Sequence, residues 1–161
     1  MRPAHDIYAE HNPAFCAYAI VAFIKAYTEV KPVGPDLPIV YLALPIALSG
    51  DLAVTFDGTN KNTGLLEWLG RTPQMSVGLV ERVNAGLEIV GAAVRFGCFT
   101  KALQLSPEGR LGLGPKKPRQ SPLSDLDALT LSSIRRAGRL GSWFATAGST
   151  RNIFGILGLT V

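Results

Sequence analysis

Apolar side chains recur at three- and four-residue steps along most of the chain, and this spacing predicts a helix-rich fold. The first such stretch covers residues 14–28, where the apolar positions form one broad stripe. Asn12 is a favourable N-cap, and Pro13 suits the first position of a helix. The pattern therefore predicts a nearly buried helix that begins at Pro13.

The next apolar run, residues 37–48, fits two structures. Ile39 and Val40 are β-branched and favour a strand, whereas the Leu and Ala residues that follow favour a helix. We interpret the run as a helix with Asp36 as its cap and a kink at Pro45, and a strand stays open as the alternative.

Two further helices are predicted after the polar stretch that follows this run. Asn62 or Thr63 would cap a short helix over residues 64–69. Thr72 would cap a second helix that begins near Pro73.

The second of these helices has an apolar face over residues 75–96. Gly78, Gly86 and Gly91 are unfavourable inside a helix, each by about 1 kcal/mol relative to alanine. They predict either a break near residues 84–86 or close packing against another backbone.

A β-hairpin is predicted after this helix, and we expect Gly97 to end the helix in a left-handed conformation. Residues 98–105 and 110–113 would form its strands, joined by a turn over residues 106–109. A helix that leads into a short hairpin resembles the end of a winged-helix module.

A basic linker, residues 114–122, precedes a C-terminal helical pair over residues 124–158. Ser124 and Asp127 have the spacing of a capping box, and the longer helix is expected to cover residues 126–146. This helix would bury the apolar side chains of Leu126, Leu129, Ile134, Ala137, Leu140 and Phe144.

The last predicted helix covers residues 150–157, with Ser149 as its cap and Gly158 as its stop. Together these elements predict a single domain, residues 1–161, that is mainly α with a small β-hairpin at about residues 98–113. We expect a winged-helix-like arrangement, with an α+β fold as the alternative.

Composition indicates a folded domain that keeps apolar surface for a partner. Hydrophobic residues make up 47% and charged residues 17% of the 161, which excludes disorder for most of the chain. Residues 13–24 and 37–48 are apolar, but each run is shorter than the roughly 20 residues of a spanning helix. Residues 1–10 lack the apolar core of a secretory signal, so we expect a cytoplasmic protein with no membrane contact.

Charge is distributed unevenly along the chain. Residues 1–108 carry 8 Lys/Arg and 10 Asp/Glu, whereas residues 109–161 carry 8 and 2. The C-terminal third could therefore face nucleic acid or an acidic protein, or it could simply be a solvated basic face. Cys16 and Cys98, each in apolar sequence, are interpreted as buried free thiols.

Seven basic side chains are the candidate contacts to nucleic acid or to an acidic partner. They are Lys116, Lys117, Arg119, Arg135, Arg136, Arg139 and Arg151. The three on the predicted long helix would form a stripe on its surface, where they could bind phosphates or only keep the protein soluble. Trp68 and Trp143 are interpreted first as core anchors and second as interface anchors.

The sequence offers no pattern typical of catalysis or metal binding. His5 and His11 both precede the first predicted helix, and no G-x-S-x-G, C-x-x-C or H-E-x-x-H motif occurs. The glycine-rich residues 109–117 lack the phosphate-loop motif and follow no strand–helix unit. We therefore predict a protein that is not an enzyme and that uses no cofactor and no metal.

Several phrases in the sequence follow one another in a characteristic order. They are N-P-A-F at residues 12–15, the proline-containing apolar run at 37–48, T-N-K-N-T-G-L-L-E-W-L-G at 59–70, A-x-R-F-G at 93–97, A-G-R-L-G-S-W-F-A at 137–145 and I-F-G-I-L-G-L at 153–159. In order and content the chain resembles the small middle component of bacterial ABC-three-component systems, which are anti-phage defence operons related to Lamassu.

This resemblance implies a non-catalytic adaptor subunit that lies between an SMC/Rad50-like ABC ATPase and an effector, often a nuclease. It implies a hetero-oligomer that touches DNA indirectly or weakly. The alternative is a stand-alone winged-helix DNA-binding regulator, motivated by the helix–hairpin order and the basic C-terminal third. Against it, the candidate recognition helix, residues 87–96, presents only Glu88 and Arg95 to bases.

Overall fold

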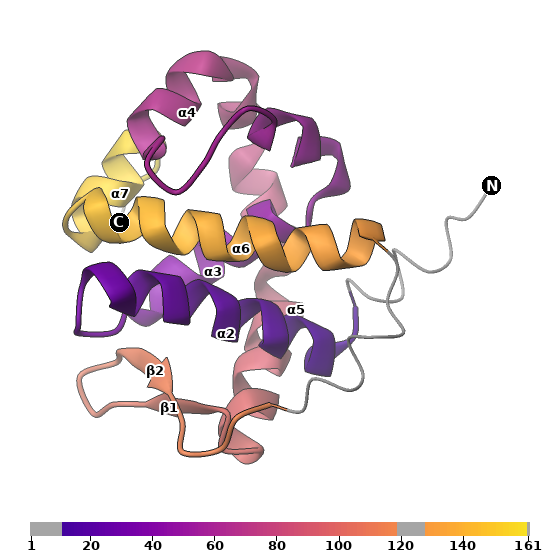
Figure 1. The fold of residues 1–161 in the computed structure, drawn as a ribbon, viewed down its shortest axis with the longest axis vertical. Helices are drawn as coiled ribbons and strands as arrows, with labels where there is room; N and C mark the ends of the chain where they lie inside the picture. The colour runs from indigo at the N-terminus through magenta and orange to yellow at the C-terminus, as the bar shows by residue number, and fades with distance from the viewer. Residues whose placement is uncertain (1–10, 119–127, 161) are drawn as a thin grey trace.

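The structure is a computed structural model, and it describes residues 11–118 and 128–160. The elements are, in chain order, α2 (Pro13–Val30), α3 (Leu37–Leu48), the 3₁₀-helix η1 (Gly50–Phe56), α4 (Leu65–Arg71), the 3₁₀-helix η2 (Pro73–Ser76), α5 (Leu79–Phe99), β1 (Leu103–Leu105), β2 (Leu111–Leu113), α6 (Ala128–Thr146) and α7 (Thr150–Ile156). Figure 1 shows α2 and α6 side by side, with α5 crossing behind them and the hairpin beside the end of α5. The predicted fold, mainly α with a small β-hairpin, is confirmed.

The central helices α2 and α6 run in the same direction at close range, and glycines on α6 make this possible. A Cβ atom added to Gly141 would lie 2.2 Å from the backbone oxygen of Phe23. A Cβ atom added to Gly138 would lie 3.8 Å from the backbone oxygen of Ala22, which is an ordinary contact. The two backbones therefore approach most closely at Gly141.

Helix α2 begins at its predicted cap. The side-chain oxygen of Asn12 accepts hydrogen bonds from the backbone N–H groups of Ala14 and Phe15, at 2.9 and 3.4 Å. Among the described helices, α2 is the one that is long and apolar enough to cross a membrane unaided. It nevertheless packs against α3, α5 and α6, and Ile20 and Ile24 are fully buried between them. This packing is that of a core helix.

Helix α3 confirms the helical interpretation of residues 37–48, with Pro45 inside it. Asp36 occupies the N-cap position, but its side chain does not cap the helix. The carboxylate instead accepts a hydrogen bond from the Thr150 hydroxyl and lies 3.5 Å from Nε of Arg110. The predicted cap is therefore wrong in its role, because this carboxylate ties the start of α3 to the hairpin and to α7.

Helix α5 is continuous, so a break near residues 84–86 is wrong. A Cβ atom on Gly86 would lie 2.7 Å from Cγ of Pro45, and one on Gly91 would lie 3.1 Å from the hydroxyl oxygen of Tyr41. The two glycines serve close packing, as the second interpretation expected, but they pack against side chains of α3 rather than against a backbone.

The starts of α4 and α5 differ from the prediction. The N-cap of α4 is Gly64, with φ of +83°, and neither Asn62 nor Thr63 caps the helix. Likewise, Thr72 makes no side-chain cap for η2, and α5 begins only after Gly78, with φ of +70°. Glycine occupies both N-cap positions because the backbone there has a positive φ, which side-chain caps rarely adopt.

The hairpin is shorter than predicted, and Gly97 does not end the helix before it. Gly97 stays inside α5, where an added Cβ would lie 2.3 Å from Cδ1 of Leu103. Lys101, with φ of +63°, instead provides the left-handed residue between helix and strand. The strands pair antiparallel, with Leu103 opposite Leu113. Gly97 is thus needed for contact with the hairpin, not for a turn.

Helices α6 and α7 follow the prediction in outline. The Ser149 hydroxyl accepts a hydrogen bond of 3.2 Å from the backbone N–H of Asn152, and Gly158, with φ of +73°, follows α7. Leu129, expected to be buried, is 69% exposed and lies in the first turn of α6. Ser124, Leu126, Asp127 and the end of the predicted linker lie outside the described residues.

Candidate interaction groove

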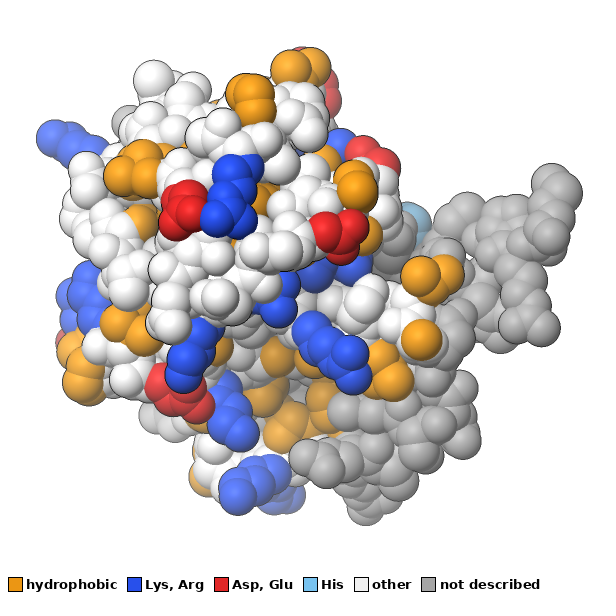
Figure 2. Space-filling view, turned by 45° about the horizontal axis from the view of Figure 1, so that its top comes forward, with side chains coloured by type: hydrophobic (Ala, Val, Ile, Leu, Met, Phe, Trp, Pro, Cys, Tyr) orange, Lys and Arg blue, Asp and Glu red, His pale blue; other side chains and the backbone are white. Residues whose placement is uncertain are grey.

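A groove with a volume of about 500 Å³ runs between α6 and η1. Its lining consists of Gly50, Ala53, Val54, Phe56, Asp57, Ser132, Arg135, Arg136 and Arg139. Basic side chains lie across the middle of the face shown in Figure 2, with apolar side chains beside them. The structure thus brings three of the predicted basic contacts together, and we call this feature the arginine groove.

Arg136 lies at the base of the groove and is only 7% exposed. Its Nε donates a hydrogen bond of 2.9 Å to the backbone oxygen of Ala47, and its Nη1 donates one of 2.8 Å to the Ser132 hydroxyl. The prediction of a surface position is therefore wrong for this residue. The carbonyl groups in the last turn of α3 have no hydrogen-bond donor within their own helix. Arg136 donates to one of these carbonyls, that of Ala47.

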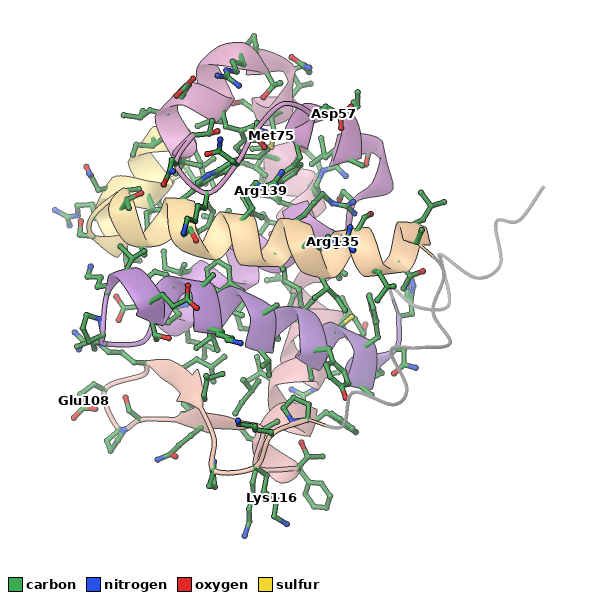
Figure 3. All side chains as sticks on the ribbon, viewed as in Figure 1. Asp57, Met75, Glu108, Lys116, Arg135 and Arg139 are labelled. Carbon is green, nitrogen blue, oxygen red and sulfur yellow. The ribbon has the colours of Figure 1, made fainter. Side chains whose placement is uncertain are left out.

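Arg139 and Arg135 lie one helical turn apart on the face of α6 that is turned toward Asp57 (Figure 3). Arg139 is partly buried, and its Nη1 donates to the backbone oxygen of Phe56 at 3.3 Å and to the Thr59 hydroxyl at 3.0 Å. Arg135 is exposed and makes no hydrogen bond or ion pair with another described residue. Of the three arginines, it is therefore the one whose charge the fold leaves most available.

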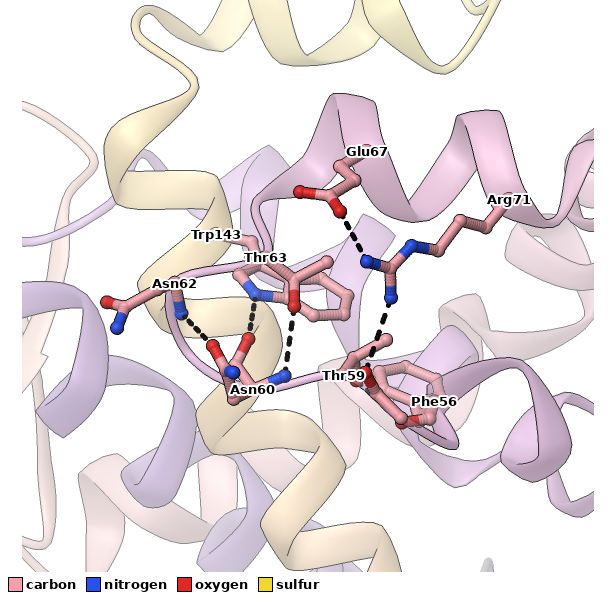
Figure 4. A network of polar contacts seen from close by, with 9 residues as sticks. Phe56, Thr59, Asn60, Asn62, Thr63, Glu67, Arg71 and Trp143 are labelled. Carbon is pink, nitrogen blue, oxygen red and sulfur yellow. Dashed lines mark hydrogen bonds and ion pairs between the residues drawn. The ribbon is translucent and has the colours of Figure 1, made fainter.

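Polar contacts fix the loop that follows η1 onto α6 (Figure 4). Nε1 of Trp143 donates a hydrogen bond of 2.9 Å to the backbone oxygen of Asn60, whose own N–H donates to the Thr63 hydroxyl at 3.0 Å. Arg71 of α4 donates to the backbone oxygen of Gly58 at 3.3 Å. The loop next to Arg139 thus has a defined conformation.

Three aromatic rings support this wall of the groove from below. Phe56 stacks on Trp143 with ring centroids 5.7 Å apart and an interplanar angle of 5°. Trp68 lies 5.0 Å from Phe56 and 5.3 Å from Trp143 by the same measure. Neither tryptophan exposes any surface, so both are core anchors, and neither indole is accessible to a partner.

Arg82 of α5 holds the first turn of η1. It donates to both carboxylate oxygens of Asp51, at 3.0 and 2.8 Å, and to the Ser49 hydroxyl at 2.7 Å. The hydrogen bond from Arg82 lowers the pKa of the Asp51 carboxyl. Sequence reasoning missed both this pair and the η1 wall, because the partners are 31 residues apart and share no local pattern.

The other predicted basic contacts lie away from the arginine groove. Lys116 and Lys117 are exposed and line a hollow beside α2, and Figure 3 shows Lys116 at the lower end of the molecule, far from Arg135 and Arg139. Arg151 is exposed on α7, and Arg119 lies outside the described residues. The predicted basic contacts that the structure describes are therefore divided among the arginine groove, the segment after the hairpin and α7.

The arginines give the groove the chemistry of an anion-binding site. Within residues 11–118 and 128–160, no group of three or more His, Cys, Asp or Glu side chains could hold a metal ion. Neither Cys16 nor Cys98 forms a disulfide within the described residues; Cys16 is buried, as predicted, whereas Cys98 is only partly buried. His11 is exposed, and His5 lies outside the described residues. Guanidinium groups such as those of Arg135 and Arg139 bind carboxylates and phosphates through paired hydrogen bonds.

Comparison with known proteins gives one family. The match covers residues 2–161, and the family is described as ABC-three component (ABC-3C) system Middle Component 3. No curated protein and no solved structure matches the chain. The family match spans every element described above, including both walls of the arginine groove. The chain therefore belongs to the ABC-three component system Middle Component 3 family.

Proposed function

We propose that this protein is a non-catalytic adaptor that links an SMC/Rad50-like ABC ATPase to an effector, often a nuclease, in a cytoplasmic anti-phage defence complex related to Lamassu. Membership in a family of middle components carries the proposal. A middle component belongs to a system with other components, and holding them together requires surfaces rather than an active site. The arginine groove is one surface suited to this role.

A second surface lies at the C-terminal end of α5 and on the hairpin. Four apolar residues are exposed there: Phe96 (39%), Phe99 (87%), Leu105 (46%) and Leu113 (43%). Figure 1 shows this end of the molecule on the opposite side of α2 from α6. Exposed apolar side chains that gather in this way are typical of protein contacts. Two separated surfaces allow two partners to be held at once.

Co-expression with the other two components of the same system tests the proposal. We expect the tagged ATPase to retain the effector when this chain is present and to lose it when the chain is omitted. The substitution Phe99→Asp should release one partner, whereas Val33→Asp, at an exposed apolar position in the loop before α3, should release none. An ATPase and effector that co-purify equally well without this chain would contradict the adaptor function.

The alternative function, a stand-alone DNA-binding regulator, predicts a different result. Such a protein binds duplex DNA through several phosphates, and its affinity falls steeply with salt. We expect the isolated chain to bind duplex DNA weakly, because the predicted basic contacts that the structure describes are divided among separate sites. Tight, salt-sensitive binding by the isolated chain would support the regulator instead.

A further inference from the structure

Two arginines of the groove, Arg135 and Arg139, have guanidinium N–H groups that make no hydrogen bond to another described residue. Both hydrogen bonds of Arg139 to its described neighbours leave from Nη1, so Nε and Nη2 remain for a ligand. Arg135 contributes its whole guanidinium group. Side chains four residues apart on a helix have Cβ atoms about 6 Å apart. The pair can therefore hold two anionic groups that are separated by a similar distance.

Apolar side chains border the same groove. Val54 lines it from η1 and is 67% exposed. Leu129 of α6 is 69% exposed, and it lies one helical turn before Ser132, which lines the groove. Covering such side chains removes apolar surface from water and favours binding. A ligand matched to this groove is thus anionic in one part and apolar in another.

The carboxylate of Asp57 indicates whether the anionic ligand of the groove is a nucleic acid or a protein. Its exposed carboxylate is part of the groove wall (Figure 3). A nucleic-acid backbone carries a negative charge at each phosphate and has no apolar side chains, so it would meet Asp57 unfavourably and leave Val54 uncovered. A protein segment can place carboxylates only where arginines lie and apolar groups elsewhere. The groove therefore favours a protein segment.

We propose that the arginine groove binds an acidic segment of a partner protein, in which carboxylates pair with Arg135 and Arg139 and a neighbouring apolar side chain covers Val54. A helix with two carboxylates one turn apart has the matching spacing. A volume of about 500 Å³ holds a few side chains, which suits one short segment rather than the face of a domain. This inference rests on the proposed adaptor function, which supplies the partner.

The affinity of the purified chain for the system component that it retains tests the inference. Arg135→Glu should weaken this affinity by at least about tenfold, since it places a carboxylate opposite the partner's acidic groups. Val54→Asp should weaken it as well. Arg151→Glu, the same change at an exposed arginine on α7, should leave the affinity unchanged. Circular dichroism of each variant verifies that these exposed substitutions preserve the fold.

A photo-crosslinking amino acid at position 54 identifies what lies in the groove. We expect it to capture a peptide of the partner that is rich in Asp and Glu. Replacing only the acidic residue that pairs with Arg135 by Lys should restore binding to the Arg135→Glu variant. Capture of nucleic acid, failure of this charge swap, or full affinity of Arg135→Glu would each overturn the inference alone. A wild-type chain that retains no component would overturn the proposed function together with it.

Discussion

The close approach of α2 and α6 at Gly141 predicts an unusual response to the substitution Gly141→Ala. The added Cβ would lie 2.2 Å from the Phe23 backbone oxygen, whereas Cβ atoms in proteins stay at least 3.0 Å from such neighbours. The helices must therefore separate by about 0.8 Å at the centre of their contact. A backbone oxygen cannot rotate away as a side chain can, so we expect an overpacking cost of about 2–3 kcal/mol.

Gly138→Ala is the matched control, because it lies one turn earlier on the same helix and has ordinary space for a methyl group. Alanine is favoured over glycine in a helix by about 1 kcal/mol at both positions, so the helical preference cancels between the two variants. Their free energies of unfolding should differ by the overpacking cost alone. For a domain of this size, the difference corresponds to roughly 4–12 °C in melting temperature.

Thermal and urea unfolding, followed by circular dichroism, measure the two variants side by side. We expect Gly138→Ala to match or exceed the wild type in stability and Gly141→Ala to fall below it. Equal stability of the two variants would refute the reasoning, because it would mean that α2 and α6 do not approach as closely as the structure shows.

Two further predictions concern the walls of the groove. Trp143→Ala should lower the free energy of unfolding by about 3–5 kcal/mol, since it removes a buried ring that contacts Phe56 and Trp68; a loss below 1 kcal/mol in urea unfolding would contradict this packing. The pKa of Asp51 is lowered in the folded state by Arg82, so its contribution to stability is present above the ordinary carboxyl pKa and is lost as the pH falls through and below it. Because Asp51 is well exposed, the effect should be at most about 1 kcal/mol. Stability measured between neutral and acidic pH should therefore change less with pH in Asp51→Asn, and an identical pH dependence in both proteins would exclude the effect.

Elements of the fold that depend on neighbouring residues were predictable from the sequence. Asn12 and Ser149 cap their helices as expected, because a cap is formed by atoms two or three residues away. The hairpin was predictable from its turn for the same reason. Gly97 was wrongly predicted to end α5, because the sequence does not reveal that Leu103 packs against it in the folded chain. A glycine near the end of a helix has the same sequence context whether it ends the helix or provides space.

The groove was predictable only in its charge. Three arginines on one helix indicate a basic surface, but the burial of Arg136 depends on the Ala47 carbonyl, 89 residues earlier. Asp57 and Val54 had no distinguishing pattern, since a 3₁₀-helix of seven residues has no clear periodicity. Which arginine stays available for a partner is thus decided by distant backbone carbonyls that only the folded chain brings near.

The pairing of α2 with α6 also bears on how the chain acquires its fold during synthesis. The first described helix finds its main packing partner near the other end of the chain, and a hydrogen bond from Lys31 to the Gly148 carbonyl spans 117 residues. A ribosome releases the α2 segment long before α6 exists. The apolar stripe of α2 therefore lacks its main packing partner until most of the polypeptide has emerged. Contacts between such distant segments slow folding, and they leave apolar surface exposed on nascent chains in the meantime.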